Sequence, residues 1–372
     1  MTVYWLLFLT PAVWALSAAK PQYLPSRSAS QSLLWFLLLV GLTLVIGLRH
    51  EVGGDWGNYL PYVEAAQWLT LAEAIFKSDP GYSLLNWMGA NWGGGIYLVN
   101  TICGLLFSLG LVAFCRQLPR PCLAVAIAMP YLVLVVAMGY SRQGVALGIA
   151  MWGLALLQRG QLWRFVFAIT LAGLFHKSAA ALILIALASR TKNKFFTAIA
   201  IAGIGAGLYV LLLADAVDAL MVGYLDAEYQ SSGAGVRVAM NALPGLTFLW
   251  FRKRFVLTPE QRQLWTYMAW ASIGFVGLLF VSPSSTAVDR VALYLIPVQL
   301  FAWSHFPDAI GRVGRKNLWA VLMVLGFYST VLFVWLFFAD HRYGWIPYKF
   351  LPFELLQEHP EYPRYSDSQA SG

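Results

Sequence analysis

Long apolar runs follow one another along almost the whole chain and constrain its fold more than any other feature. They lie near 3–19, 32–48, 95–115, 122–139, 143–158, 163–175, 178–189, 195–214, 238–251, 264–281, 289–305 and 318–339. A helix needs about 20 mainly apolar residues to cross a bilayer. Only 11% of the residues are charged, against about 25% in an average soluble domain. We therefore predict an all-α, polytopic integral membrane protein with about 12 transmembrane helices, some of them short or re-entrant.

The placement of lysine and arginine predicts how these helices are oriented. With alternating sides, the basic stretches "RTKNK" (190–194) and "FRKR" (251–254) fall in inner connections, where Glu260 and Asp308 are the only acids. Such a bias marks the cytoplasmic side of a membrane protein. It accounts for the net charge of +8 without nucleic acid as a partner. The first run lacks the basic start of a signal peptide, so we expect it to be a membrane span, with both termini outside.

A single transmembrane domain is expected over residues 1–342, followed at 343–372 by a polar C-terminal tail that is partly disordered. Two outer loops are expected within the domain, a long one at 49–94 and a shorter one at 215–237. In the long loop, "YVEAAQWLTLAEAIF" (62–76) has apolar residues at helical spacing and should lie along the membrane surface. The cysteines have no metal-ligand spacing, and we expect no metal and no other cofactor.

The stretch "LAGLFHKSAAALIL" (171–184) places His176 and Lys177 in the middle of an oily segment. If 163–189 crossed the membrane once, every later loop would change side and the basic stretches would lie outside, against the charge bias. The chain is therefore expected to turn back at His176 and Lys177, on the outer side. Two thin crossings and one re-entrant hairpin both satisfy this turn.

Arginines gather at the outer ends of the expected helices. Arg142, Arg237 and Arg290 each begin an inbound helix, and Arg49 follows the second span. A helix start attracts anions through its free N–H groups, and the planar guanidinium fork suits phosphate oxygens. A single arginine at a helix end usually snorkels to lipid headgroups. Because these four lie outside among acids, we predict instead a shared pocket for an anionic ligand with a lipid tail.

Several short motifs belong to the same region of the chain. They are "LRHEVGGDWGNY" (48–59), "DPGYSLLNWM" (79–88), "SRQGVALGI" (141–149), "LAGLFHKSAAALIL" (171–184), "GVRV" (235–238) and "DRVALYLIP" (289–297). Together they resemble the EpsG-like branch of the Wzy-type bacterial polysaccharide polymerases and cover roughly residues 40–300, in the family's order. One departure is Gly54, where the family more often has threonine or serine.

The resemblance implies a membrane glycosyltransferase that acts in exopolysaccharide or O-antigen biosynthesis. Such a polymerase lies in the bacterial inner (cytoplasmic) membrane, with its active site facing the periplasm or exterior. It transfers a growing glycan from undecaprenyl diphosphate onto the next lipid-linked repeat unit. The implied partners are the donor and acceptor oligosaccharides on undecaprenyl diphosphate, with a chain-length regulator and a flippase of the same pathway as further partners.

The transfer needs positive charge where the diphosphate leaves and a base for the attacking hydroxyl. Arginines supply the first without a metal, and His176, followed by Asp55 and Asp289, is the favoured candidate for the second. The candidate catalytic residues are His176, Asp55, Arg142 and Arg290. The candidate substrate-binding residues are Arg49, Arg237, Gln143, Lys177, Asp289, Trp56 and Tyr59, the two aromatic residues as platforms for sugars.

Three other functions remain open at this stage. A glycan ligase of the O-antigen ligase type would share the pocket and differ only in its product. A lipid or oligosaccharide transporter or flippase would place polar residues through the whole membrane, near broken helices at the midplane, whereas the ionisable residues here collect at one face. A membrane acyltransferase with a catalytic histidine would leave the outer arginines unexplained.

Overall fold

The computed structural model of the chain describes residues 1–18, 21, 29–190, 233–282 and 284–357. Within these ranges the chain is built from helices, and the only extended pairing is an isolated bridge between Arg49 and Phe350. The all-α fold class predicted from the apolar runs is thus confirmed. The predicted run at 195–214 and the outer loop at 215–237, except for its last residues, lie outside the described part.

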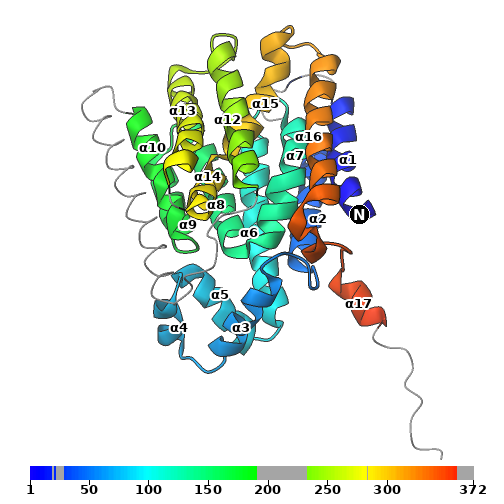
Figure 1. Ribbon diagram of the computed structural model, residues 1–372, viewed down its shortest axis with the longest axis vertical. Coiled ribbons are helices and arrows are strands. Elements are labelled where there is room, and N and C mark those ends of the chain that lie inside the picture. Colours follow the sequence, from blue (N-terminus) through cyan, green and yellow to red (C-terminus); the bar gives the residue numbers. More distant parts are fainter. Residues whose placement is uncertain (19–20, 22–28, 191–232, 283, 358–372) are drawn as a thin grey trace, which may run out of the picture.

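The helical bundle in Figure 1 follows the predicted apolar runs closely. Its helices are α1 (Thr2–Ser17), α2 (Ala29–Gly47), α6 (Gly95–Cys115), α7 (Pro121–Ala128), α8 (Ser141–Gln158), α9 (Leu162–Gly173), α10 (Ala181–Arg190), α12 (Ala234–Phe251), α13 (Pro259–Val281), α15 (Pro297–Ile310) and α16 (Leu318–Phe338). By length and composition, α6, α13 and α16 can each cross a membrane, and α1, α2, α7 and α9 contribute shorter apolar segments. Twelve complete crossings and the side of each terminus remain predictions.

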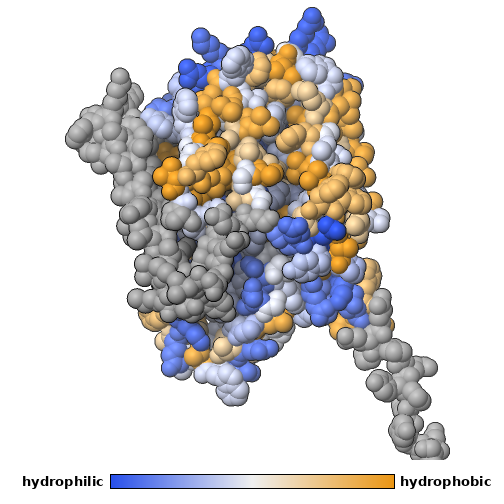
Figure 2. Space-filling model, viewed as in Figure 1, coloured by the Kyte–Doolittle hydropathy of each residue, from blue (hydrophilic) through white to orange (hydrophobic). Residues whose placement is uncertain are grey.

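An apolar belt surrounds the bundle between two hydrophilic ends, as Figure 2 shows for one face. Exposed apolar residues include Leu37, Trp250, Phe280, Leu322 and Phe338. Water would penalise so continuous an apolar surface, whereas lipid tails do not. The belt and the apolar helices together show a membrane protein.

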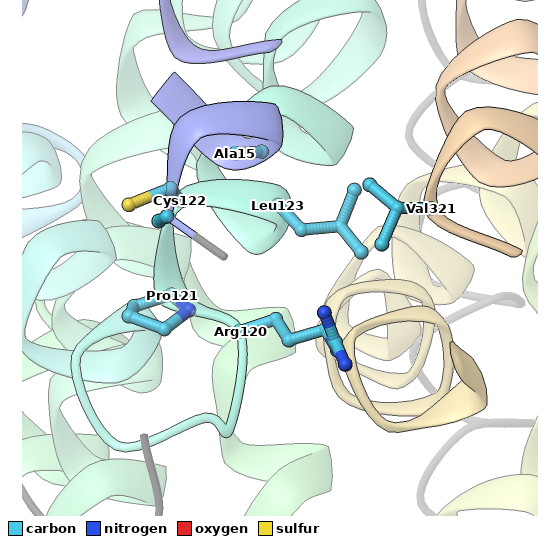
Figure 3. Close-up of a pocket in the computed structure, with 7 residues that line it drawn as sticks. Ala15, Arg120, Pro121, Cys122, Leu123 and Val321 are labelled. Atoms are coloured by element: carbon cyan, nitrogen blue, oxygen red, sulfur yellow. The ribbon is translucent and has the colours of Figure 1, made fainter. Parts of the chain in front are cut away.

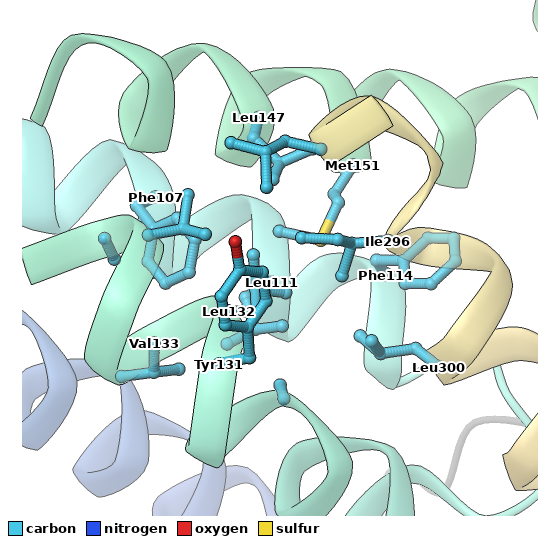
Figure 4. Close-up of a cluster of buried hydrophobic side chains, with 14 of the residues drawn as sticks. Phe107, Leu111, Phe114, Tyr131, Leu132, Val133, Leu147, Met151, Ile296 and Leu300 are labelled. Atoms are coloured by element: carbon cyan, nitrogen blue, oxygen red, sulfur yellow. The ribbon is translucent and has the colours of Figure 1, made fainter. Parts of the chain in front are cut away.

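The centre of the bundle is one continuous apolar segment. It consists of α7 and a π-helix, Met129–Ala137, and every side chain from 121 to 137 is buried. A helix that is apolar all round must be covered on all sides, and here α1, α6, α15 and α16 surround it. Figure 4 shows Phe107, Leu147 and Ile296 closing around Tyr131 in this core. The wider helical winding begins beside Pro130, which has no N–H to donate.

Basic residues mark one end of the bundle. The connections α12–α13 and α15–α16, which contain Arg252 and Arg315, lie at the end opposite to the outer helices (Figure 1). There Arg120 donates to the Asp308 carboxylate from Nε at 3.1 Å and from Nη2 at 3.0 Å. A cavity of about 20 Å³ beside Arg120 (Figure 3) holds roughly one water molecule and is too small for a substrate.

Three short helices cover the other end of the bundle (Figure 1). They are α3 (Trp56–Ala66), α4 (Leu71–Lys77) and α5 (Pro80–Asn91), which form most of the predicted outer loop at 49–94. The amphipathic stretch 62–76 is divided between α3 and α4. The division follows from a capping box, in which Thr70 N–H donates to the Glu73 carboxylate at 2.8 Å and Glu73 N–H to Thr70 Oγ1 at 3.4 Å.

The first part of the predicted C-terminal tail folds against the bundle. A 3-10 helix, Asp340–Gly344, leads to Trp345, which is 2% exposed, and α17 (Leu351–Gln357) follows. The segment pairs with the chain beyond α2, because His50 N–H donates to Lys349 O at 3.0 Å and Leu351 N–H to Leu48 O at 2.9 Å. Residues 340–351 therefore form part of the folded domain, while 358–372 lie outside the described part.

Candidate functional site

The candidate site lies where the outer helices α3–α5 meet the bundle. Four segments surround it: the start of α8, the turn between α9 and α10, the start of α12, and α14 (Ser285–Ala292). Each of these segments carries a site residue that was predicted from the sequence: Arg142, His176, Arg237 and Arg290, respectively.

The predicted break at His176 is confirmed. Helix α9 ends at Gly173 and a 3-10 helix begins at Lys177, with His176 in extended backbone between them. The turn binds the start of α5, because Gly81 N–H donates to Leu174 O at 2.8 Å. A Cβ at Gly81 would lie only 3.0 Å from the Phe175 ring, so glycine permits this approach. The contact brings "DPGY" (79–82) beside the histidine.

Arg142, in the first turn of α8, is held between an acid and three aromatic rings. Its Nη1 lies 3.3 Å from Asp79 Oδ2, and about a third of its side chain is exposed. Its guanidinium lies 5.7–6.0 Å from the ring centres of Tyr59, Tyr62 and Tyr82. This arrangement fixes the cation while leaving part of it accessible. Asp79 and Tyr82 were not among the candidate residues, although their motif "DPGY" was one of those that carry the family resemblance.

Arg237 and Asp289, both expected to bind substrate, bind each other. Arg237 Nη2 lies 2.7 Å from Asp289 Oδ2, and its Nε donates to both carboxylate oxygens at 2.9 Å. Their side chains are 15% and 12% exposed. The pair joins α12 to α14 and neutralises one of the expected arginines, so its charge is not free to balance an anionic ligand.

Arg290 is the most accessible of the expected arginines. Its side chain is exposed, and it forms no ion pair with the part of the chain that the structure describes. Its carbonyl accepts a hydrogen bond from Gln143 Nε2, which is buried. Gln143 was expected to bind substrate, but the structure uses it to fix α14 against α8. Arg290 can therefore pair with a ligand without breaking an ion pair to the described residues.

Asp55 and His176 lie within the electrostatic reach of the same two arginines. Burial raises the pKa of Asp55 above its usual range, while Arg290 and Arg142 oppose the shift. Burial, together with Arg142, Arg290 and then Lys177, lowers the pKa of His176 to about 4. His176 is therefore neutral at pH 7 and can accept a proton or a hydrogen bond. The structure thus brings together all four candidate catalytic residues.

Buried polar atoms around His176 lack a hydrogen-bond partner among the described residues. They are His176 Nδ1, Tyr82 OH and Tyr294 OH. The His176 and Tyr294 rings lie 6.5 Å apart, and Tyr82 contacts Arg142. Buried polar groups are normally satisfied, so these atoms are open to a hydroxylated ligand or to water. No sequence pattern singled out Tyr294.

Arg49, Trp56 and Tyr59 belong to the support of the site. Arg49 is 1% exposed and donates to Val52 O at 2.9 Å, Asn100 Oδ1 at 3.1 Å, Ser141 Oγ at 2.8 Å and also Ile46 O. Trp56 lies under its guanidinium at 5.7 Å. The expectation that these buried groups contact substrate is therefore corrected, because protein atoms occupy their surfaces. The hydrogen bond from Arg49 holds Ser141, the residue before Arg142.

A groove of about 540 Å³ between α1 and α2 is lined by apolar side chains apart from Thr10. In the described ranges, no group of three His, Cys, Asp or Glu side chains forms a metal site. Lys177 is exposed and acts on Asp79 and His176 through its charge.

These features define a helical membrane protein with an arginine-, tyrosine- and histidine-containing site beneath a layer of short helices. The EpsG family model matches residues 32–350. The chain therefore belongs to the EpsG family, as its motifs indicated, and this membership points to a role of the polysaccharide-polymerase kind. No curated protein and no solved structure matches the chain significantly.

Proposed function

We propose that this protein is a polysaccharide polymerase of the inner membrane. It transfers a growing glycan from undecaprenyl diphosphate onto the next lipid-linked repeat unit, at the face of the membrane that carries α3–α5. This face is the periplasmic or outer side, because the basic connections lie at the opposite end of the bundle. The donor and acceptor oligosaccharides are its partners, and a flippase and a chain-length regulator act with it.

Arg290 and Arg142 bind the donor diphosphate in this mechanism. Negative charge grows on the diphosphate as its bond to the anomeric carbon breaks, and fixed guanidinium groups stabilise that charge. Arg290 is exposed and forms no ion pair with any residue that the structure describes, and Arg142 is held by Asp79 and the tyrosines. The Arg237–Asp289 pair keeps α12 and α14 in register beside them.

His176 accepts the proton of the attacking sugar hydroxyl. The hydroxyl oxygen forms the new bond to the anomeric carbon, the carbon–oxygen bond to the diphosphate breaks, and undecaprenyl diphosphate leaves as the anion. Two of the cations that lower the pKa of His176 are the arginines that would bind the diphosphate. Binding of the anion offsets their effect and makes the imidazole more basic. Asp55 orients the acceptor.

One observation supports this proposal most directly: Arg142 and Arg290 act on the same half-buried, neutral histidine, whose buried Nδ1 has no hydrogen-bond partner among the described residues. The test uses purified protein in liposomes with a radiolabelled oligosaccharide on undecaprenyl diphosphate. A ladder of lipid-linked products spaced by one repeat unit supports the proposal. Unchanged substrate, with the protein folded, contradicts it.

A ligase and a transporter give different results in this assay. A ligase would transfer glycan to a different lipid or protein acceptor and leave no ladder. A transporter would move the labelled lipid across the liposome membrane without forming a glycosidic bond.

A further inference from the structure

The side chain of Trp345 lies between the two backbone segments that carry Asp55 and Arg142. A Cβ built on Gly139 would lie 2.6 Å from Trp345 Cζ2, and one built on Gly54 would lie 3.1 Å from Trp345 Cη2. Gly54 precedes Asp55, and Gly139 lies three residues before Arg142. Real Cβ atoms essentially never approach other atoms as closely as at Gly139, and the contact at Gly54 would be tighter than nine in ten real ones. Glycine at both positions therefore makes room for the indole.

The indole is fixed from several sides. Its Nε1 donates to Leu134 O, in the π-helix, at 2.7 Å. The backbone carbonyl of Trp345 accepts a hydrogen bond from Tyr4 OH. The Trp335 ring packs edge-on against the indole, with the ring centres 5.5 Å apart. At 2% exposure it cannot stack on a sugar.

The same segment also holds the loop before Asp55 through its backbone. Gly53 N–H donates to Gly344 O at 2.7 Å. Gly53 has φ +114°, a conformation that favours glycine, and its Cα faces Met138 O so closely that a Cβ would lie 2.3 Å from it. The loop at 53–55, the segment at 138–139 and the chain at 344–345 therefore form one packed unit.

We propose that Trp345 is a positioning residue, which fixes the separation of Asp55 and Arg142 by filling the space between Gly54 and Gly139. Asp55 lies within the electrostatic influence of Arg142 and Arg290, so a shift of the loop changes the geometry around the reacting groups. A displacement of about 1 Å can cost about 100-fold in rate. This role rests on the proposed polymerase function.

A double-mutant cycle tests the proposal. Gly54→Ala places a methyl group against Cη2 of Trp345. Trp345→Phe removes the part of the indole that contains this atom. We expect Gly54→Ala to lower the maximal rate of polymer formation about tenfold or more, with little change in the donor concentration that gives half-maximal rate. In the Trp345→Phe background, the same change should cost less than about twofold. Gly57→Ala is the matched control, since a Cβ there meets nothing within 4 Å.

Thermal unfolding is measured in parallel for the four proteins of the cycle, which are the wild type, the two single variants and the double variant. Equal loss of rate from Gly54→Ala in both backgrounds would overturn the positioning role. So would a loss of rate that only follows the loss of folded protein. Absence of polymer from the wild-type protein would instead reject the polymerase function, and coupling in thermal stability would then still report the contact between Gly54 and Trp345.

Discussion

Arg237 and Asp289 face each other across α12 and α14, with Nη2 and Oδ2 2.7 Å apart. This pairing changes how the positive charge of the site is distributed. Arg237 is neutralised, and Arg49 is buried with its donors bound to protein atoms. The charge available to a diphosphate is therefore that of Arg290 and the exposed part of Arg142.

Removing one partner of the Arg237–Asp289 pair should destabilise the protein, because the other charge stays partly buried and loses this ion pair. We expect Arg237→Gln or Asp289→Asn alone to lower the free energy of unfolding by about 2–4 kcal/mol. The double variant should recover most of this loss. Thermal unfolding in detergent measures it, with Lys349→Gln as the control, because the Lys349–Glu51 pair is exposed to solvent and should contribute little to stability. Additive losses in the double variant would show that the two side chains do not interact.

Arg49 and Arg290 should behave oppositely when replaced by methionine. Arg49→Met leaves Asn100, Ser141 and two carbonyls without their donors and should cost several kcal/mol of stability. Arg290→Met removes an exposed side chain and should leave the unfolding temperature unchanged while abolishing polymer formation. Protein level, unfolding temperature and polymer are measured together. A stable Arg49→Met protein would show that its buried bonds are dispensable.

The acid limb of the pH–rate profile should report His176. With a pKa of about 4, the imidazole stays neutral down to about pH 5 and can still accept a proton. At donor concentrations far below saturation, the rate in liposomes reports the protein without bound donor. It should therefore change little between pH 7.5 and 5.5, whereas an unshifted histidine of pKa about 6.5 would lose roughly tenfold. Lys177→Gln removes a cation, raises the pKa of His176 and should move the loss of rate to higher pH.

Lys77→Gln, an exposed lysine of α4, is the control for this shift. His176→Asn should abolish the transfer. Full-length polymer from His176→Asn, or a wild-type midpoint near pH 6.5, would reject His176 as the base in the environment described.

Much of the fold could be predicted from the sequence, since the apolar runs and the helices coincide at positions such as α6 and α16. The break at His176 also followed, because the charge bias requires the chain to turn back there. The division of 62–76 into α3 and α4 did not, although Thr70 and Glu73 carry its capping signal. Apolar spacing alone suggested one longer helix.

Partnerships between distant residues could not be predicted. Asp289 and Arg237 were both candidate residues, but nothing in the sequence connected Asp289 to Arg237, 52 residues earlier. Burial was equally hidden, because Arg49 and Arg290 look alike as outer arginines, while the fold encloses one and exposes the other. Trp345 belongs to the stretch that the sequence predicts to be a polar tail. The two glycines that the indole contacts, Gly54 and Gly139, are far from it in the chain.

The central claim is that Arg290 stabilises a departing lipid diphosphate, and one comparison tests it most directly. The strain used lacks the gene for this protein and expresses in its place the wild type, Arg290→Lys or the exposed control Arg342→Lys. Lipid-linked glycans are extracted from each strain and separated on a gel. We predict a polymer ladder from the wild type and the control, and from Arg290→Lys an accumulation of single repeat units with a loss of about 100-fold in polymer. A wild-type ladder from Arg290→Lys, at equal protein level, would contradict the claim.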